Sequence, residues 1–434
     1  MITIVSPEIY TYGSMIIGGI LRDAGYNVML TKELHADTDT VFVSLHSTLQ
    51  LIDSNIKKFF GMLGRKMVFV GGPVSTYPRI VLGELSNVSC VVVGEGEEIV
   101  LDLLERGVSE DVSGIAFKDC NGTIVETKKR PFLTNLTRPL PLIPGDISRQ
   151  NVRGANVYIE THRGCLGNCD FCQVPGFFGQ TIRSRDKEDI LAEVKAFKKA
   201  GARKIAVSGG TGSLYGYDKE ELSHSLIELL RDVSEITGPK NLSVPDMRVD
   251  YVNEEVLEAI RRYTMGWVFF GIESGSNRIL KQMHKGISIE KAMDAVEYTR
   301  LQGVHVAGSF IVGHPSETEK DYELTRDFVE DAMLEDVFVS IIEPIPSTRF
   351  ANLISDISEE DNPSFKPHTG EYSTLKLSES EARFFDLMLS AETSKPVPRI
   401  VTNQQYDALL NIARSQGEDV RAVTRLIWKY KKLF

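Results

Sequence analysis

The chain has 434 residues, of which 42% are hydrophobic and 25% charged, and its formal net charge is −11. This length allows two or three domains that each bury a core, while the acidic balance excludes an extended basic surface for nucleic acid. There is no run of about 18 apolar residues and no basic-then-apolar signal peptide at the start. We therefore expect a cytoplasmic protein with neither a membrane nor a nucleic-acid partner.

Short apolar segments alternate with helical patterns over the first 107 or so residues. This alternation is typical of a doubly wound parallel sheet and predicts a Rossmann-like α/β domain over residues 1–130. Four glycines, Gly71, Gly72, Gly94 and Gly96, fall just beyond strand ends, where a backbone without Cβ can approach a ligand closely. The dipeptide Asn121-Gly122 predicts the turn of a hairpin.

A proline-rich linker, residues 131–154, separates this domain from a second series of strand and helix patterns. Six strand–helix units in residues 155–348 predict a partial (β/α)6 barrel of the TIM type, in which the carboxyl ends of the strands build the site. One of its helices is expected from Lys219 to Ile236. The remaining residues, 349–434, predict a helical carboxyl-terminal domain.

Five cysteines are few for this length, and three of them fall within eight residues, in the segment YIETHRGCLGNCDFCQVPGFFG. Cys165, Cys169 and Cys172 have the spacing CxxxCxxC on a glycine-containing loop after a buried strand, and three such thiolates can hold three irons of a cubane cluster. A zinc knuckle or reduced cysteines in the core are the alternatives, but zinc takes four ligands and usually pairs of thiols. Cys90 in an apolar strand is expected in the core, and Cys120 in the hairpin turn is expected to be exposed.

The cysteine segment, with aromatic Phe171 before its last cysteine, resembles the signature of radical S-adenosylmethionine (SAM) enzymes. The resemblance implies a 4Fe-4S cluster on the three cysteines, with the fourth iron open to SAM. It also implies a reductant that supplies an electron, so that SAM is cleaved to a 5'-deoxyadenosyl radical.

Further segments match that superfamily in order, and the resemblance assigns them to SAM. Gly209, Gly210 and Thr211 stand where the family has Gly-Gly-Glu, so a hydroxyl replaces a carboxylate. Arg248 matches a residue that faces the SAM carboxylate, with a surface arginine as the alternative. The remaining candidates are Glu273 and Ser274 as ribose partners, with a buried ion pair as the alternative for Glu273, and Gly313 beside the adenine.

The amino-terminal domain resembles the cobalamin-binding domains of B12-dependent radical SAM enzymes. The resemblance rests on VFVGGPVSTYPRIVLGEL and CVVVGEGEEIVLDLL, and it implies cobalamin contacts from Gly71, Gly72, Gly94, Glu95 and Gly96. The DxHxxG motif that supplies an axial histidine in many B12 proteins is absent, so base-off cobalamin without that ligand is expected. His46 is a candidate axial ligand, with a polar loop residue as the plainer alternative.

Across most of its length the chain resembles the archaeal group that C-methylates a glutamine of methyl-coenzyme M reductase. The segments SPEIYTYGSMIIGGIL, SGGTGSLYG, NLSVPDMRVDYV and SIIEPIPST carry this resemblance. It implies a radical SAM, cobalamin-dependent methyltransferase that methylates an unactivated sp3 carbon of a protein, through methylcobalamin, in a methanogen. Candidates for lining the substrate path are Tyr215, Tyr217, His314 and Glu343.

Three alternatives stay open from the sequence. A methylthiotransferase would carry three further cysteines before the motif, whereas only Cys90 and Cys120 precede it. A B12-dependent methylase of a small molecule would need a large apolar pocket below the carboxyl-terminal helices. A non-catalytic iron–sulfur protein would need a fourth cysteine in reach.

Overall fold

The structure is a computed structural model that describes residues 1–217, 222–397 and 399–433. Its contacts divide the chain into two units, which are described separately below. Unit 1 comprises Met1–Cys165, Gln173–Gly209 and Asp232–Leu242, and unit 2 comprises Leu166–Cys172, Gly210–Arg231 and Ser243–Phe434.

The first sheet of unit 1 has the order β2-β1-β3-β4-β5-β6-β7. It is parallel from β2 to β5 and ends in two antiparallel strands. Because these short apolar strands are covered on both faces, they form a parallel sheet. The strands are β1 (Ile2–Val5), β2 (Val28–Thr31), β3 (Thr40–Ser44), β4 (Met67–Gly71), β5 (Cys90–Val92), β6 (Ile115–Lys118) and β7 (Ile124–Glu126).

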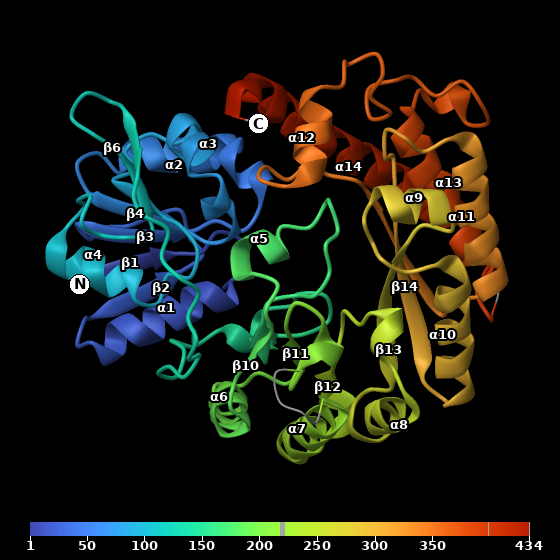
Figure 1. Ribbon diagram of the computed structural model, residues 1–434, viewed down its shortest axis with the longest axis horizontal. Helices are drawn as coiled ribbons and strands as arrows, with labels where there is room; N and C mark the ends of the chain where they lie inside the picture. The colour runs from blue at the N-terminus through green and yellow to red at the C-terminus, as the bar shows by residue number, and fades with distance from the viewer. Residues whose placement is uncertain (218–221, 398, 434) are drawn as a thin grey trace. The chain divides into compact units, whose positions relative to one another are not determined.

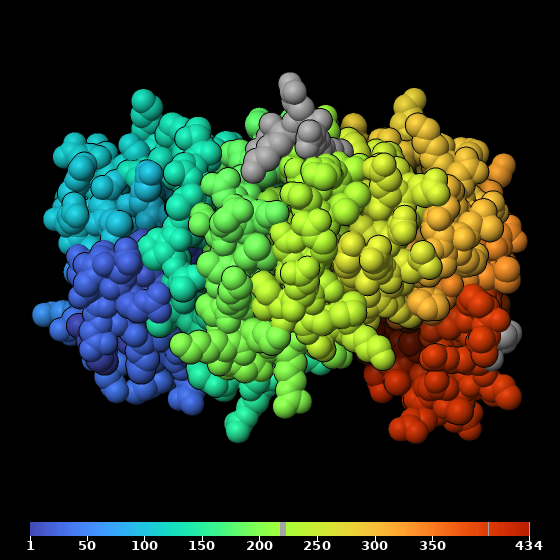
Figure 2. Space-filling view, turned by 90° about the horizontal axis from the view of Figure 1, so that it is seen from below, coloured from blue at the N-terminus to red at the C-terminus, as the bar shows by residue number. Residues whose placement is uncertain are grey.

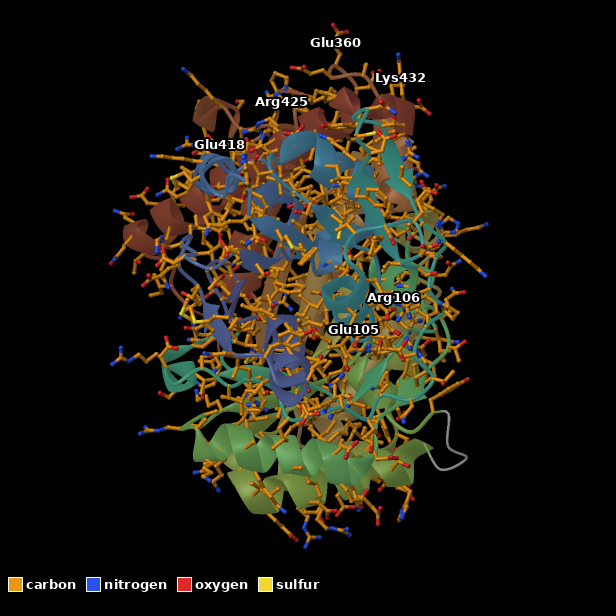
Figure 3. All side chains as sticks on the ribbon, turned by 90° about the vertical axis from the view of Figure 1, so that its left-hand side faces the viewer. Glu105, Arg106, Glu360, Glu418, Arg425 and Lys432 are labelled. Atoms are coloured by element: carbon orange, nitrogen blue, oxygen red, sulfur yellow. The ribbon has the colours of Figure 1, made fainter. Side chains whose placement is uncertain are left out.

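Helices cover both faces of this sheet, as expected for a doubly wound fold. Leu21 of α1 and Leu103 of α4 join one core cluster with Phe69 and Cys90, so these two helices share a face. Figure 1 shows α2 and α3 on the opposite face. The helices are α1 (Tyr12–Asp23), α2 (Ser54–Met62), α3 (Pro78–Glu84) and α4 (Ile99–Arg106); Figure 3 shows Glu105 and Arg106 at the end of α4.

The predicted hairpin is confirmed between β6 and β7. The amide of Gly122 donates to the carbonyl of Asp119 at 3.0 Å, and Gly122 has a φ of +77°, which favours glycine in this turn. Cys120 is exposed at the turn, and Cys90 is fully buried in β5. Both cysteines lie where the sequence predicted them.

The six strands expected for the barrel are present in two parallel sheets. The first has the order β12-β11-β8 and the second β13-β14-β15. They are β8 (Val157–Glu160), β11 (Ile205–Ser208), β12 (Leu242–Ser243), β13 (Trp267–Glu273), β14 (His305–Val312) and β15 (Asp336–Ile341). The segment LSVPDMRV has the apolar pattern of a longer strand, but β12 is limited to Leu242–Ser243. The chain turns at Pro245, which cannot donate to a ladder, and pairing resumes as a single bridge between Met247 and Phe270.

Helices follow the barrel strands in both units. In unit 1 these are α5 (Val174–Phe178) and α6 (Lys187–Lys199). The residues of α7 (Leu222–Thr237) are divided between the two units after Arg231. The expected start of this helix at Lys219 lies outside the described residues. In unit 2, α8 (Glu254–Tyr263), α10 (Ile289–Leu301) and α11 (Glu319–Ala332) lie beside the second sheet, and α9 (Asn277–Gln282) is a short helix. Their outer surfaces, coloured yellow to orange, are visible in Figure 2.

The carboxyl-terminal region is helical, as predicted. It contains α12 (Arg349–Ser355), α13 (Glu379–Thr393) and α14 (Asn403–Lys429). Thr402 and Ser378 form capping boxes that satisfy the first amides of α14 and α13. None of the helices that the structure describes combines the length and the apolar character needed to cross a membrane.

Candidate functional site

The cysteine loop begins in unit 1 after β8. Cys165 is buried, and its amide donates to the carbonyl of Gly179 at 3.2 Å. Gly164 has a φ of +92°, and a Cβ there would lie 2.1 Å from the carbonyl oxygen of Thr181. Glycine is therefore required for the chain to enter the loop beside this backbone.

The rest of the loop, Leu166–Cys172, belongs to unit 2. The amide of Asp170 donates to the carbonyl of Met283 at 3.0 Å, and the Asp170 carbonyl accepts from the amide of Phe350 at 3.0 Å. The predicted aromatic residue, Phe171, packs on the cluster that contains Met283 and Phe350. Cys169 and Cys172 are partly buried, and none of the three loop cysteines forms a disulfide.

The glycine segment after β11 lies at a strand end, as predicted. A Cβ on Gly209 would come within 2.4 Å of three atoms of the His162 ring, so the packing of this ring requires glycine at position 209. In unit 2, Thr211 is buried and its hydroxyl donates to the carbonyl of Gly210 at 2.9 Å.

Arg248 and Glu273 are brought together by a third residue, Lys285. The Arg248 guanidinium donates to the Lys285 carbonyl at 3.3 Å, and Lys285 Nζ lies 2.7 Å from Glu273 Oε1. Arg248 also forms a bidentate ion pair with Asp250. Burial alone would lower the pKa of Lys285, but the charges of Glu273 and Cys169 outweigh burial and raise it. The buried ion pair considered for Glu273 is thus present, at a residue with a strained φ of +73°.

Ser274 and Gly313 also have structural partners. The Ser274 hydroxyl accepts from the amide of Ser276 at 3.1 Å and lies 3.2 Å from Thr325 Oγ1. The Gly313 amide donates to Glu317, and a Cβ on Gly313 would lie 2.4 Å from Ser380 Oγ. The structure therefore gives both residues hydrogen-bond or packing partners within the protein.

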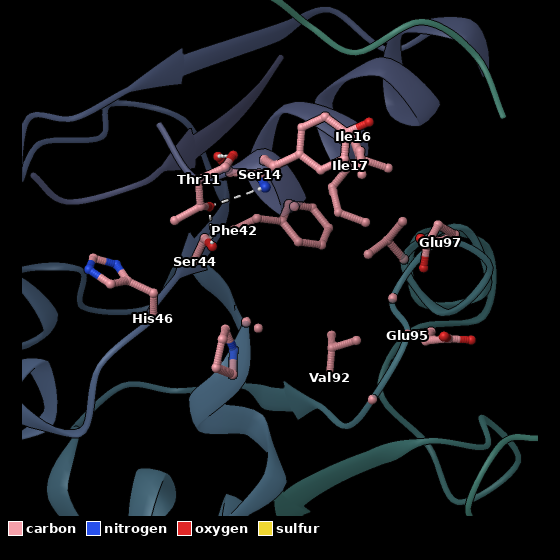
Figure 4. A pocket seen from close by; sticks show the side chains of 18 of the residues that line it. Thr11, Ser14, Ile16, Ile17, Phe42, Ser44, His46, Val92, Glu95 and Glu97 are labelled. Atoms are coloured by element: carbon pink, nitrogen blue, oxygen red, sulfur yellow. Dashed lines mark hydrogen bonds between the residues drawn. The ribbon is translucent and has the colours of Figure 1, made fainter. Parts of the chain in front are cut away.

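Unit 1 contains a cavity of about 310 Å³ at the carboxyl edge of its first sheet (Figure 4). The strand order changes direction at β1 and β3, which is where ligands bind in sheets of this type. All five residues expected to contact cobalamin line this cavity, namely Gly71, Gly72, Gly94, Glu95 and Gly96. Its other walls are mostly apolar and include Ile4, Ile16, Ile17, Phe42, Val92, Phe177 and Phe178.

One wall of the cavity is polar. Arg163 lies 3.1 Å from Glu160 and 3.3 Å from Glu95, and it also pairs with Glu97. Burial raises the pKa of Glu160, but Arg163 and Arg138 outweigh burial and bring it down to about 2. The Glu160 carboxylate therefore remains charged and is balanced by the buried side chains of Arg163 and Arg138.

Other candidates from the sequence occupy varied places. His46 lines the cavity, but its ring is directed away from Phe42 and Val92 (Figure 4), and its Nε2 lies 4.0 Å from Glu8. Of the expected substrate-path residues, Tyr215 and His314 are buried, Glu343 is half-buried, and Tyr217 is exposed beside Tyr251.

Three residues of these sites, Lys285, Tyr12 and Arg163, were not predicted from the sequence. Lys285 lies in a segment already recognised, yet only the fold reveals that it links Arg248 to Glu273. Tyr12 and Arg163 line the cavity although they are distant in sequence from Gly71, Gly72, Gly94 and Gly96. The available signal for Tyr12 was its place at the start of α1, in the first turn of chain after β1, because ligands bind beyond the ends of parallel strands.

Comparison with known proteins agrees with this geometry. A model of the radical SAM superfamily matches residues 159–329. A protein of Methanocaldococcus jannaschii named "Putative methylthiotransferase MJ0865" is 54% identical over 442 residues, which cover 100% of this chain and 97% of that protein.

Two solved structures share the fold. The radical SAM methyltransferase TsrM from Kitasatospora setae, solved with cobalamin and a 4Fe-4S cluster, has a TM-score of 0.69 and 13% identity over 98% of this chain and 99% of its own. The cobalamin-dependent SAM radical enzyme OxsB, solved with aqua-cobalamin and SAM, has a TM-score of 0.63 and 18% identity over 96% of this chain and 61% of its own.

The cysteine loop, the strand-end segments that follow it and a relative that matches along the whole chain lead to one conclusion. This protein belongs to the radical SAM superfamily.

Proposed function

We propose that this radical SAM enzyme is a cobalamin-dependent methyltransferase that adds a methyl group to an unactivated sp3 carbon. The observation that carries the proposal is the apolar cavity of unit 1, which lies at the ligand-binding edge of a doubly wound sheet in the same chain as the cysteine loop. The superfamily supplies a 4Fe-4S cluster and SAM as cofactors.

The donor set of the loop fits a cluster. Three thiols occur in one segment of eight residues, and the charge of buried Lys285 interacts with Cys169. Within the described part of the chain, no three His, Cys, Asp or Glu side chains are placed to hold a single metal ion. In a cubane, by contrast, each thiolate binds a different iron.

The cavity fits a large apolar cofactor. A Cβ built on Gly13, Gly71 or Gly94 would meet no other atom within 4 Å, so these backbones face open space. A side chain at any of them would occupy the space that a corrin or its tail would fill. Gly71, Gly72, Gly94, Glu95 and Gly96 would hold the cobalamin, with backbone groups nearest to it.

When bound, the cofactors supply a radical that removes a hydrogen atom and a methyl group that replaces it. The protein residues orient these groups and exclude water. The buried pairs of Arg163 with Glu95, Glu97 and Glu160 fix the polar wall of the cavity. The pair of Lys285 with Glu273 gives a second fixed charge pair in unit 2, next to the cysteine loop.

We further propose that the methylated carbon belongs to a glutamine of methyl-coenzyme M reductase, so that a subunit of that reductase is the protein partner. The resemblance in the quoted segments supports this assignment, and the relative from Methanocaldococcus jannaschii gives an archaeal setting. SAM contacts from Gly209, Gly210, Thr211, Arg248, Glu273, Ser274 and Gly313 stay part of the same proposal, with Lys285 added to them.

A methylthiotransferase is the second candidate, because the 54% identical relative bears that name. Such an enzyme needs a second cluster in the amino-terminal domain. Here the two cysteines of that region cannot supply it: Cys90 is fully buried in β5, and Cys120 is exposed in the hairpin. The structure therefore favours methyl transfer over methylthio transfer.

The test uses the full chain, prepared without oxygen and with iron and cobalt quantified. SAM, a reductant and a glutamine-containing reductase peptide are added, and mass spectrometry follows 5'-deoxyadenosine and the peptide. We expect deoxyadenosine and a methyl gain with the wild type and with Cys120→Ala. Cys165→Ala, Cys169→Ala and Cys172→Ala should each abolish both products.

The outcomes separate the alternatives. Deoxyadenosine without peptide methylation keeps the radical enzyme and overturns the substrate assignment. A product heavier by one additional sulfur atom overturns the methyltransferase in favour of a methylthiotransferase. Bound zinc in place of iron, or full activity in any of the three loop variants, overturns the proposal as a whole.

A further inference from the structure

Two buried polar groups face each other beside the cysteine loop, and neither has a full set of partners. Asp170, between Cys169 and Cys172, is 6% exposed, and its Oδ1 is buried without a hydrogen bond in the described part of the chain. His314, at the end of β14, is 0% exposed, and its Nε2 is buried without a hydrogen bond there. His314 Nε2 lies 4.0 Å from Asp170 Oδ2.

The partner of the other ring nitrogen decides which atom of His314 carries the proton. The amide of Ser316 donates to His314 Nδ1 at 3.2 Å, so Nδ1 presents its lone pair. Burial lowers the pKa of His314 to about 4, which keeps the ring neutral at physiological pH. The proton of the neutral ring is therefore on Nε2, which faces the Asp170 carboxyl group.

The same two residues are linked through Phe350. The His314 ring packs on the Phe350 ring at a centroid distance of 5.6 Å, and the Phe350 amide donates to the Asp170 carbonyl at 3.0 Å. The backbone of Asp170 is thus fixed by Phe350 and Met283, and its carboxyl group faces His314 while the charges of His284 and Arg349 also act on it. All of these residues lie within unit 2.

Leaving both groups unsatisfied is costly, since each buried polar group without a partner costs about 1–3 kcal/mol. A movement of roughly 1 Å would bring the pair into hydrogen-bond distance, and one water could also bridge it. Both changes would satisfy the donor and the acceptor together.

We propose that His314 is a positioning residue for the cluster: its Nε2–H hydrogen-bonds the Asp170 carboxylate and holds the segment between Cys169 and Cys172 in the conformation that binds iron. This inference rests on the proposed function, because it assumes the cluster on these cysteines. His314 would act through Asp170 and not by direct contact with the cluster.

The test compares two substitutions at one position. His314→Phe keeps a ring against Phe350 but removes the donor, whereas His314→Gln keeps an N–H at nearly the same place. We measure the rate at which the reconstituted protein loses iron to a chelator and the electron paramagnetic resonance spectrum of the reduced cluster with and without SAM. His224→Phe, on an exposed histidine, is the matched control.

We expect His314→Phe to lose iron about tenfold faster than the wild type, the lower range for loss of an outer-shell partner of a metal ligand, and to change the spectrum. His314→Gln should restore both, and His224→Phe should match the wild type. The iron-free proteins should melt at the same temperature. If His314 only stabilised the fold, their melting temperatures would differ and glutamine would not restore the spectrum.

A double-mutant cycle with Asp170→Leu provides a second measurement. If the two residues act as a pair, the double variant should lose iron no faster than the worse single variant. The inference is overturned if the rates of iron loss of the two single variants multiply in the double variant. It is also overturned if His314→Phe loses iron at the wild-type rate, or if His314→Gln loses iron as fast as His314→Phe. A wild type that holds no iron overturns the proposed function as well, whereas the other outcomes leave the proposed function standing.

Discussion

Glu317 is a fully buried carboxyl group at the amino-terminal side of α11. It accepts from the Gly313 amide at 2.9 Å and pairs with Arg383 at 3.0 Å. Burial nevertheless raises its pKa from 4.5 to about 7, although Arg383 acts in the opposite direction. Between these pH values the folded protein holds a proton that the unfolded chain has released.

This difference sets the sign of a pH effect on stability. Because folding takes up a proton at Glu317, the unfolding free energy should fall as the pH rises from 4.5 to 7. In Glu317→Gln this contribution is absent, so the melting temperature of the wild type minus that of the variant should decrease steadily across the window. Calorimetry of the iron-free protein at several pH values measures it.

The control is Glu319→Gln, because Glu319 also contacts Arg383 but its side chain is 70% exposed. Its difference from the wild type should stay flat over the same range. A flat difference for Glu317→Gln would show that the buried carboxyl group does not keep its proton.

Single residues also show where prediction from sequence stopped. The cysteine spacing and Phe171 could be interpreted directly, because their chemistry depends on local order along the chain. The role of Glu273 could not, since its partner Ser309 lies on the neighbouring strand β14 and its partner Lys285 lies after α9. Likewise, nothing in the sequence marks His314 as a buried ring opposite Asp170.

At the scale of elements, the strand ends of the first sheet carry a testable consequence. Gly71 ends β4, and its missing side chain leaves open space in the cavity. Gly71→Leu should fill part of this space and weaken cobalamin binding by about tenfold or more, equivalent to at least about 1.4 kcal/mol, while the fold is kept. Absorbance titration of the protein with cobalamin measures the affinity.

Gly61→Leu is the matched control, because Gly61 lies on the exposed side of α2 and also has no neighbour within 4 Å of an added Cβ. It should bind cobalamin as the wild type does. Equal affinity for Gly71→Leu and the wild type would remove this cavity as the binding place.

The elements themselves were largely predictable, for a physical reason. Buried parallel strands are short apolar runs bounded by glycines, and amphipathic helices carry their own caps, so both leave local signals. The break after β12 was missed because LSVPDMRV has the composition of a strand although Pro245 interrupts it. The domain limits at residues 130, 154 and 348 stay predictions.

At the scale of the whole molecule, Tyr12 ties separate parts of unit 1 together. Its buried hydroxyl donates to Glu193 on α6 and accepts from Arg138 and Arg185, each at 3.0 Å. Arg185 in turn pairs with Glu193 at 2.6 Å. One hydroxyl at the start of α1 thus joins α1, the linker and α6.

Tyr12→Phe should therefore destabilise unit 1 by about 1–3 kcal/mol, the cost of leaving buried donors unsatisfied. Hydrogen-exchange mass spectrometry should show faster exchange in α1 and α6 together, because both lose the same partner. Tyr26→Phe is the comparison, since its hydroxyl makes no hydrogen bond among the described residues. Faster exchange in α1 alone would contradict a shared network.

The hairpin between β6 and β7 provides a site for selective chemical labelling. Once a cluster occupies the three loop cysteines, Cys90 is enclosed in the core and Cys120 is the thiol that solvent can reach. A maleimide should then attach at one place, on a turn well separated in sequence from the cofactor loops. The enzyme could be tethered to an electrode in a single orientation through this sulfur, so that electron delivery is controlled by an applied voltage instead of a dissolved reductant.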